Sequence, residues 1–299
     1  MLHYISWNVD PVMFRIHAFG NEIPLGWYGL LFAFGLLLGQ KILLHVFHKE
    51  GKPSSDIELL TIYLVIATII GARLGHFVFY EWDYLVESPT DWFMQLVTPP
   101  FSGLASHGAS IGILLALYFY STKKKDQSFL WVADRVVIPI CLAGAFIRFG
   151  NLMNSEIYGL PTDLPWAFLF LRETDPSLLP VVPRHPTQIY EALFCIFLLI
   201  VTYYLWNKKR TRIPEGFTTG VFFIMLFSFR FMVEFLKNDQ VDYERMMALN
   251  MGQILSIPSI LTGILILVYA NRKNQILKNP NQPEDLRSGN GSSENNNLI

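Results

Sequence analysis

Seven long apolar runs limit what this chain can fold into more than any other feature. They occupy residues 27–47, 57–80, 103–120, 129–147, 189–206, 217–235 and 251–270. A helix needs about 20 mostly apolar residues to cross the hydrocarbon core of a bilayer, and each run approaches or reaches this length. The 299-residue chain is 52% hydrophobic and only 16% charged, which is typical of an integral membrane protein. We therefore predict an all-α integral membrane protein with seven transmembrane helices.

The placement of basic residues predicts the orientation of these helices. Lys and Arg gather in the first, third and fifth connections and after the last run, whereas the other connections are acidic or mixed. The basic residues concerned are Lys49, Lys52, Lys123, Lys124, Lys125, Lys208, Lys209, Arg210, Arg212, Arg272 and Lys273. Because cytoplasmic loops collect Lys and Arg, we expect the N-terminus outside and the C-terminus in the cytoplasm.

The connections and the C-terminal end divide the chain into a membrane domain and a tail. We predict a transmembrane domain at residues 1–274 and a disordered cytoplasmic tail at 275–299, which is rich in Asn, Gly and Ser. External loops are expected at 81–102 and 160–186. The first contains several aromatic residues and suits a segment on the outer leaflet. The second contains six prolines and is expected to form an ordered cap without helices.

Glycines recur at four-residue spacing within the predicted helices. The pairs are Gly35 with Gly39, Gly71 with Gly75, and Gly108 with Gly112. In lipid, small residues at this spacing let two helix backbones approach closely. The pairs therefore indicate a compact helix bundle, and no function follows from them alone.

The fourth apolar run ends in a polar segment, residues 148–159, which contains a guanidinium group, carboxamides and a carboxylate. An ionised side chain near the bilayer centre costs roughly 3 kcal/mol, so such groups usually lie in a polar cavity and have a function. A helix continued through this segment would align four residues on one face: Arg148, Asn151, Ser155 and Gly159. Gly150 would allow a break that exposes helix-end amides to an anion. Alternatively, Arg148 extends only to the outer headgroups.

Three other polar groups lie near the predicted outer ends of helices. His107 is flanked by small residues, and it is either a hydrogen-bonded packing residue or a base beside a substrate. Arg230 and Glu234, spaced i and i+4, form either a structural ion pair or an arginine held ready for a phosphate. Arg73 and His76 form a further basic pair at i and i+3.

Two more segments contribute polar residues at the same predicted side. Tyr28 begins the first helix beside Trp27, where an interfacial aromatic belt would explain both residues equally well. Gln188 and Glu191 lie at the start of the fifth helix, where a carboxylate also stabilises the helix dipole. Two arginines suit a phosphate, and a histidine nearby suits proton removal from a nucleophile. These residues indicate a membrane enzyme that acts on phospholipid.

The polar segment and several others together resemble one family of membrane enzymes. Residues 148–159 read R-F-G-N-L-M-N-S-E-I-Y-G, which resembles the signature G-R-x-G-N-F-x-N-x-E-x-x-G of bacterial prolipoprotein diacylglyceryl transferases. Further matching segments follow in the family's order at 27–30, 71–75, 106–108, 184–191, 229–235 and 251–258. The resemblance covers nearly the whole chain apart from the tail, and the combination of segments makes it specific.

The resemblance implies an enzyme of the bacterial plasma (inner) membrane with its active site toward the outer leaflet. Members transfer diacylglyceryl from phosphatidylglycerol to the lipobox cysteine thiol of a prolipoprotein signal peptide, the first step of lipoprotein maturation. They release glycerol 1-phosphate. The nucleophile therefore comes from the substrate, in agreement with the placing of Cys141 and Cys195 inside predicted helices. The resemblance implies no cofactor, no metal and no nucleic-acid partner.

The resemblance also implies roles for individual residues. His107 would be the base, and Arg148 and Arg230 would bind the phosphate and its developing charge. The substrate-binding residues would be Tyr28, Arg73, Asn151, Glu156, Gly159, Gln188 and Glu234. In this scheme Glu234 holds Arg230, and Gly159 allows close approach of the lipid.

The chain departs from the family pattern at four positions. Ile147, Leu152 and Ala109 stand where the pattern has glycine, phenylalanine and glycine, and these changes mainly alter packing. Leu226, one turn before Arg230, stands where some members have a tyrosine proposed to assist catalysis. Two other functions use the same residues. One is a transporter or flippase for an anionic lipid, and the other is a non-catalytic relative that binds lipid or partner proteins.

Overall fold

The protein is described by a computed structural model over residues 4–18, 21–98, 103, 105–173, 178–209, 213–238 and 247–278. It divides into two compact units. Unit 1 consists of Met1–Gly39 with Val137–Ile299, and unit 2 consists of Gln40–Val136. Two long helices pass from one unit into the other, and the units are described one at a time.

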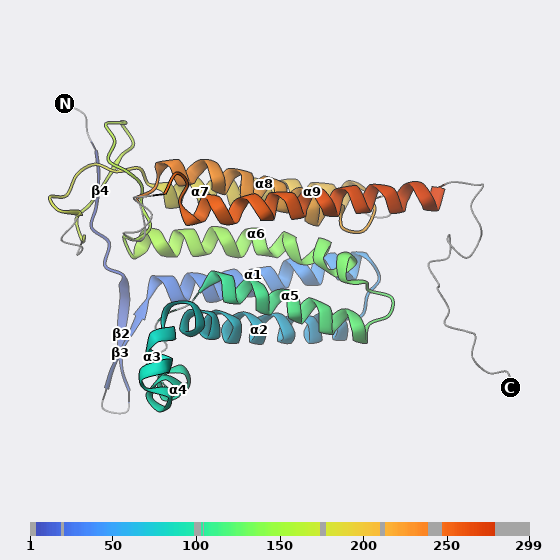
Figure 1. Ribbon diagram of the computed structural model, residues 1–299, viewed down its shortest axis with the longest axis horizontal. Helices are drawn as coiled ribbons and strands as arrows, with labels where there is room; N and C mark the ends of the chain where they lie inside the picture. The colour runs from blue at the N-terminus through green and yellow to red at the C-terminus, as the bar shows by residue number, and fades with distance from the viewer. Residues whose placement is uncertain are drawn as a thin grey trace. The chain divides into compact units, whose positions relative to one another are not determined.

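All seven apolar runs form helices (Figure 1). They are α1 (Trp27–Lys49), α2 (Ser54–Tyr80), α5 (Ser106–Lys123), α6 (Phe129–Met153), α7 (Thr187–Lys209), α8 (Phe217–Val233) and α9 (Met251–Lys278). Within the described residues, six of the helices are long and apolar enough to cross a membrane, and α5 is not among the six. The prediction of a largely helical membrane protein is confirmed.

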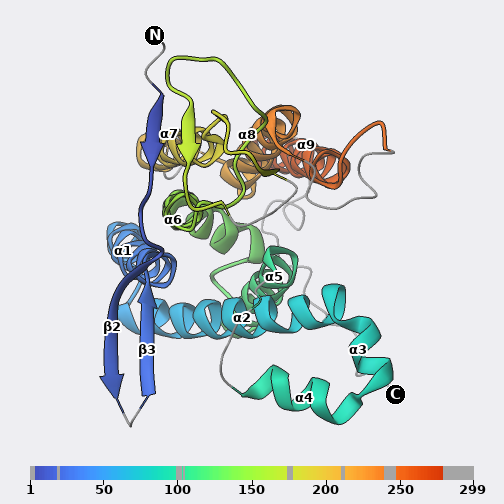
Figure 2. The same ribbon diagram turned by 90° about the vertical axis from the view of Figure 1, so that its left-hand side faces the viewer.

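Among the described residues of unit 1, four short strands accompany the helices, and the all-α prediction missed them. β2 (Val12–Ala18) and β3 (Asn21–Gly26) form an antiparallel hairpin that leads into α1 (Figure 2). β1 (Ile5–Trp7) runs parallel to β4 (Phe168–Phe170), in the cap that follows α6. A strand of three residues has too little alternation to be recognised in a sequence. These two strands also lie more than half of the chain apart in the sequence, since Ile5 pairs with Phe168.

The connection at residues 81–102, which we expected outside the membrane, contains two short helices among its described residues, α3 (Trp82–Glu87) and α4 (Pro89–Val97) in unit 2 (Figure 2). Arg73 of α2 donates hydrogen bonds to two carbonyl oxygens of α4, that of Gln95 at 2.6 Å and that of Leu96 at 3.2 Å. Several apolar side chains of α4 remain exposed. This arrangement is consistent with the predicted segment at a membrane surface.

The predicted glycines bring α2 and α5 together backbone to backbone in unit 2. A Cβ atom on Gly71 would lie 2.5 Å from the carbonyl oxygen of Gly108, and one on Gly75 would lie 2.5 Å from the Gly108 Cα. Real Cβ atoms do not approach other atoms so closely. The prediction of close helix packing at these positions is therefore confirmed.

Ion pairs join the first and third connections at one end of unit 2. Lys52 lies 2.5 Å from Asp126, and Lys124 pairs with Asp56. The hydrogen bond from Lys52 lowers the pKa of Asp126 below its usual value. Helices that alternate in direction place every second connection at the same end, and these contacts are consistent with that pattern.

In unit 1, α8 packs against both α7 and α9 (Figure 1). The end of α6, the start of α7, the end of α8 and the start of α9 meet through polar contacts. Further along α9, Lys273 pairs with Glu215, which precedes α8, at 3.3 Å. The helix α9 continues to Lys278, past the predicted start of the tail at Gln275. The rest of the predicted tail lies outside the described residues.

Candidate active site

A tight turn ends α6 inside the polar segment. The helix stops at Met153, and Ser155 and Ile157 adopt left-handed φ angles of 54° and 57°. The prediction of a helical face that continues to Ser155 and Gly159 is therefore wrong. Left-handed residues other than glycine cost about 1–3 kcal/mol each, and they persist where the surroundings hold them. The turn thus gives residue 156, which lies between them, a fixed position.

Gly150 does not break the helix as expected. It remains helical and buried, and a Cβ atom there would lie 2.7 Å from Cδ2 of Tyr28. The glycine therefore lets the ring of Tyr28 pack directly on the α6 backbone. Gly150 follows Arg148 by two residues. The contact therefore places Tyr28, at the start of α1, against the part of α6 that carries Arg148.

Side-chain amides hold the carboxylate of Glu156. Asn151 Nδ2 donates to Glu156 Oε1 at 2.8 Å, and Asn154 Nδ2 donates to the same oxygen at 3.2 Å. Gln188 Nε2 donates to the backbone oxygen of Glu156 at 2.6 Å. On its other side, Asn151 Oδ1 accepts a hydrogen bond from Arg148 Nη1 at 3.3 Å. These contacts hold both the carboxylate and the backbone oxygen of Glu156 in the turn that follows the helix.

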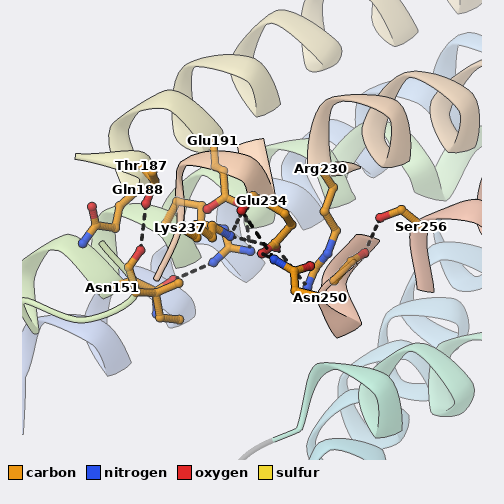
Figure 3. Close-up of polar contacts among 12 residues, drawn as sticks. Asn151, Thr187, Gln188, Glu191, Arg230, Glu234, Lys237, Asn250 and Ser256 are labelled. Atoms are coloured by element: carbon orange, nitrogen blue, oxygen red, sulfur yellow. Dashed lines mark hydrogen bonds and ion pairs between the residues drawn. The ribbon is translucent and has the colours of Figure 1, made fainter. Parts of the chain in front are cut away.

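A chain of alternating charges joins the two predicted arginines. Arg148 Nη2 lies 3.2 Å from Glu191 Oε1. Lys237 Nζ lies 3.1 Å from the same oxygen (Figure 3). Lys237 Nζ also lies 3.1 Å from Glu234 Oε1, which is 3.8 Å from Arg230 Nη2. The two glutamates and the lysine are buried, whereas the side chains of Arg148 and Arg230 are 20% and 31% exposed. The arginines are thus the accessible ends of this chain.

Two contacts concern alternatives that the sequence left open. Arg148 pairs with the buried carboxylate of Glu191, and its own side chain is 20% exposed. Glu191 pairs with two cations, so it does more than stabilise the dipole of α7. The expected contact between Glu234 and Arg230 is present, at the longer distance of 3.8 Å. One oxygen of Glu191, Oε2, is buried and has no hydrogen-bond partner among the described residues.

The start of α9 completes the surroundings of Glu234. Asn250 Nδ2 donates to Glu234 Oε2 at 3.3 Å, and Asn250 Oδ1 accepts from the backbone N–H of Gln253 at 2.9 Å as a helix N-cap. A Cβ atom on Gly252 would lie 2.5 Å from Cδ of Glu234. Only a glycine therefore allows this approach of α9 to the carboxylate.

Gly159 lies where three backbone segments cross. Its N–H donates to the carbonyl oxygen of His185 at 2.8 Å, and the N–H of Leu160 donates to the carbonyl oxygen of Leu236 at 2.8 Å. A Cβ atom on Gly159 would lie 2.7 Å from the Cβ of His185. The glycine thus permits the cap to pack against the end of α8.

Burial lowers the pKa of His185, which favours its neutral form.

A family model described as prolipoprotein diacylglyceryl transferase matches residues 11–269. The chain belongs to the prolipoprotein diacylglyceryl transferase family. A protein from Chloroherpeton thalassium is 41% identical over 278 residues, which are 92% of this chain and 97% of its own length. One from Porphyromonas gingivalis is 42% identical over 287 residues, 93% of this chain and 96% of its own length. Both are named phosphatidylglycerol–prolipoprotein diacylglyceryl transferase.

Most of the residues that the family resemblance assigned to the site come together in unit 1. These are Tyr28, Arg148, Asn151, Glu156, Gly159, Gln188, Arg230 and Glu234. Sequence reasoning missed Lys237, Asn250 and Gln253 as parts of the same site. Lys237 follows Glu234 by three residues, a spacing that suggests an ion pair on a helix. Asn250 immediately precedes the family motif at residues 251–258, and this position was the signal that could have identified it.

Two residues assigned to the diacylglyceryl transferase site belong to unit 2. His107 lies in the first turn of α5, is exposed, and has its ring 6.3 Å from that of Phe79. Arg73 is buried, lies over the ring of Phe77 at 4.6 Å and donates to backbone carbonyls of α4. These contacts give Arg73 a structural role in holding α4.

Proposed function

We propose that this chain transfers diacylglyceryl from phosphatidylglycerol to the lipobox cysteine thiol of prolipoproteins and releases glycerol 1-phosphate. Family membership and the names of the relatives support this activity. The observation that carries it is the pair of accessible arginines, Arg148 and Arg230, held by buried carboxylates at one end of unit 1. Guanidinium groups bind phosphate oxygens in a planar, bidentate manner, and this arrangement suits a phospholipid headgroup.

The reaction replaces a carbon–oxygen bond with a carbon–sulfur bond. The thiol of the peptide loses its proton to a base, and its sulfur attacks the glyceryl carbon that carries the phosphate. The bond between that carbon and the phosphate oxygen breaks, and the electron pair leaves with glycerol phosphate. Arg148 and Arg230 stabilise the negative charge that develops on the leaving phosphate. The two buried cysteines, Cys141 and Cys195, take no part.

The headgroup also suits the polar groups beside Arg148. The terminal glycerol of phosphatidylglycerol carries two hydroxyl donors. Glu191 Oε2 is a buried acceptor without a hydrogen-bond partner among the described residues, and buried polar atoms in native proteins usually have a partner. We assign this oxygen to a headgroup hydroxyl, with Asn151, Glu156 and Tyr28 orienting the same end of the lipid.

His107 is the proposed base for the thiol proton. Its exposure in the first turn of α5 leaves the imidazole accessible to a substrate. Leu226 stands where some relatives have a tyrosine, and a leucine side chain has no hydroxyl to assist catalysis. It packs on an apolar cluster that includes Cys141 and Phe222. Histidine has a pKa near neutrality, which suits proton removal from a thiol whose own pKa is about 8.5.

We further propose that all seven helices, α5 included, cross the bacterial inner membrane with the N-terminus outside. The basic first and third connections share one end of unit 2, and the ends of α6 to α9 alternate within unit 1. Because basic loops stay in the cytoplasm, the arginine site then faces the outer leaflet. A fusion reporter placed in the connection between α5 and α6 is expected to report the cytoplasm.

The first test of the function uses the purified protein in a lipid bilayer. With phosphatidylglycerol and a synthetic lipobox peptide, we expect a thioether-linked diacylglyceryl peptide and an equal amount of glycerol phosphate, both measured by mass spectrometry. A peptide with serine in place of the lipobox cysteine is the control and should give neither product. Peptide or lipid binding without glycerol phosphate release would instead support a transporter or a non-catalytic relative.

A second prediction concerns His107. The substitution His107→Ala should lower kcat about 100-fold, since general acid–base catalysis contributes factors of this order. Because the imidazole is exposed, the thermal unfolding midpoint should stay close to that of the wild type. His48→Ala is a matched control, since His48 is also exposed and lies at the other predicted side of the membrane. Equal rates for His107→Ala and the wild type would exclude His107 as the base.

A further inference from the structure

Lys237 is a buried cation between two buried carboxylates. It follows the 3-10 helix η2 (Glu234–Leu236), and its side chain is only 2% exposed. Its Nζ lies 3.1 Å from Glu191 Oε1 and 3.1 Å from Glu234 Oε1 (Figure 3). A buried charge persists only where partners of opposite charge compensate it. Lys237 is therefore paired with α7 and with the end of α8 at the same time.

The same two carboxylate oxygens also face the arginines. Glu191 Oε1 is shared by Lys237 and Arg148, and Glu234 Oε1 is shared by Lys237 and Arg230. Lys237 has the closer position on Glu234, because Arg230 is 3.8 Å away, beyond normal hydrogen-bond length. On Glu191 the two cations are almost equally close, at 3.1 Å for Lys237 and 3.2 Å for Arg148. Lys237 thus competes with the guanidinium groups for both acceptors.

The charge balance of the linked groups depends on this lysine. Three cations and two carboxylates are joined by these ion pairs, which gives the five groups a net charge of +1. Without Lys237 their net charge would be zero. Glu156 lies outside these ion pairs, because its carboxylate is bound by the amides of Asn151 and Asn154. Lys237 thus supplies the excess positive charge among the ion-paired groups that a singly charged phosphodiester would balance.

The backbone fixes Lys237 in this position. Lys237 forms an antiparallel bridge with Gly159, and the N–H of Leu160 donates to the carbonyl oxygen of Leu236 at 2.8 Å. The lysine is thereby attached to the segment that follows the strained turn at residue 156. Its ammonium group has little freedom to move away from the two glutamates.

We propose that Lys237 is a positioning residue for the transfer reaction. It shares the carboxylates of Glu191 and Glu234 with Arg148 and Arg230, and it thereby weakens their hold on the two guanidinium groups, which bind the lipid phosphodiester. This inference rests on the proposed function of the same site. Lys237 itself acts through the arginines and does not contact the substrate.

The test compares Lys237→Met, Lys237→Arg and the double variant Lys237→Met/Glu191→Gln. Rates are measured in phosphatidylcholine nanodiscs while either phosphatidylglycerol or the lipobox peptide is varied. Lys237→Met should raise KM for phosphatidylglycerol about tenfold or more and leave KM for the peptide unchanged, because charge-assisted contacts to the phosphate weaken. Lys237→Arg should restore most of the affinity. Adding Glu191→Gln to Lys237→Met should restore part of it, because the net charge returns to +1.

Lys273→Met is the matched control. Lys273 forms an exposed pair with Glu215 more than 20 residues beyond the start of α9, and its removal should leave both KM values unchanged. An unchanged KM for phosphatidylglycerol in Lys237→Met would overturn the inference. So would an equal rise in both KM values with a lower unfolding midpoint and no rescue by Glu191→Gln, because that result indicates a structural role alone.

A binding measurement separates this inference from the proposed function. Phosphatidylglycerol that remains bound after exchange into phosphatidylcholine nanodiscs is quantified for the wild type and for Lys237→Met. If the wild type forms no thioether product, the proposed function fails, and retention then tests Lys237 by itself. Lower retention by Lys237→Met supports the inference, and equal retention contradicts it.

Discussion

The substitution Arg148→Ala is expected to lower kcat/KM about 1,000-fold, the upper part of the range for loss of one preorganised donor to a developing anion. Arg148 joins Asn151 to Glu191 and presents a partly exposed guanidinium group. Its loss removes a phosphate ligand and also leaves Glu191 with one cation in place of two. Thioether formation and glycerol phosphate release should fall together in the peptide assay.

Arg148→Lys distinguishes charge from geometry. An ammonium group keeps the charge but cannot make two parallel hydrogen bonds to a phosphate, so this variant should also lose most of the activity. Arg172→Ala is the control, since Arg172 forms a 3.3 Å pair with Asp10 and is 40% exposed. Its rate should match that of the wild type. Wild-type activity in Arg148→Ala, with the protein shown to be folded, would remove Arg148 from the proposed mechanism.

The second large effect is expected on folding, from Gly71→Leu. A Cβ atom at this position would lie 2.5 Å from the Gly108 carbonyl oxygen, and backbone cannot move aside as a flexible side chain can. Overpacking of a well-packed core costs about 1–3 kcal/mol, and a backbone clash belongs at the upper end or beyond. We expect little or no monodisperse protein after extraction in detergent.

A pair of smaller substitutions keeps this prediction testable if Gly71→Leu yields no protein. Gly71→Ala should lower the thermal unfolding midpoint in detergent by several degrees, because even one methyl group meets the Gly108 backbone. Gly29→Ala is the matched control, since a Cβ atom there has no neighbour within 4 Å. Alanine exceeds glycine in helix propensity by about 1 kcal/mol, so Gly29→Ala should keep or raise the midpoint. Equal midpoints for the two variants would refute the packing role of Gly71.

The sequence predicted the helices well because their signal is local. Each apolar run was long enough to form a helix by itself, and the boundaries in the structure differ from the predicted ones by a few residues at most ends. The turn after α6 was different. The apolar run predicted a helix that ends at Ile147, and the alignment of Arg148 with Gly159 on one face required a helix through residue 159. The helix α6 ends between these limits, at Met153. Asn151 and Asn154 bind the carboxylate of Glu156, and Gln188 of α7 binds the backbone oxygen of the same residue, a contact that only the tertiary structure supplies.

The candidate site also combines features that the sequence predicted with features that it did not predict. Arg148, Asn151, Arg230 and Glu234 were recognisable because a charged or amide side chain at the end of an apolar run is costly and so usually has a function. Their arrangement was not recognisable. We assigned no role to Lys237 from the sequence, and in the structure it is the buried centre of the charged chain.

The sequence by itself determined that the chain is a largely helical membrane protein of the diacylglyceryl transferase family, with polar residues at the helix ends. Hydropathy and motifs follow from neighbouring residues, so they can be identified along the chain. Only the tertiary structure decided which charge pairs with which. Lys237 and Glu191 are 46 positions apart, and they meet because the ends of α7 and α8 converge. The Coulomb energy of an ion pair depends on the distance between its charges in space. The packing of the helices sets that distance, and the separation of the two residues along the chain does not.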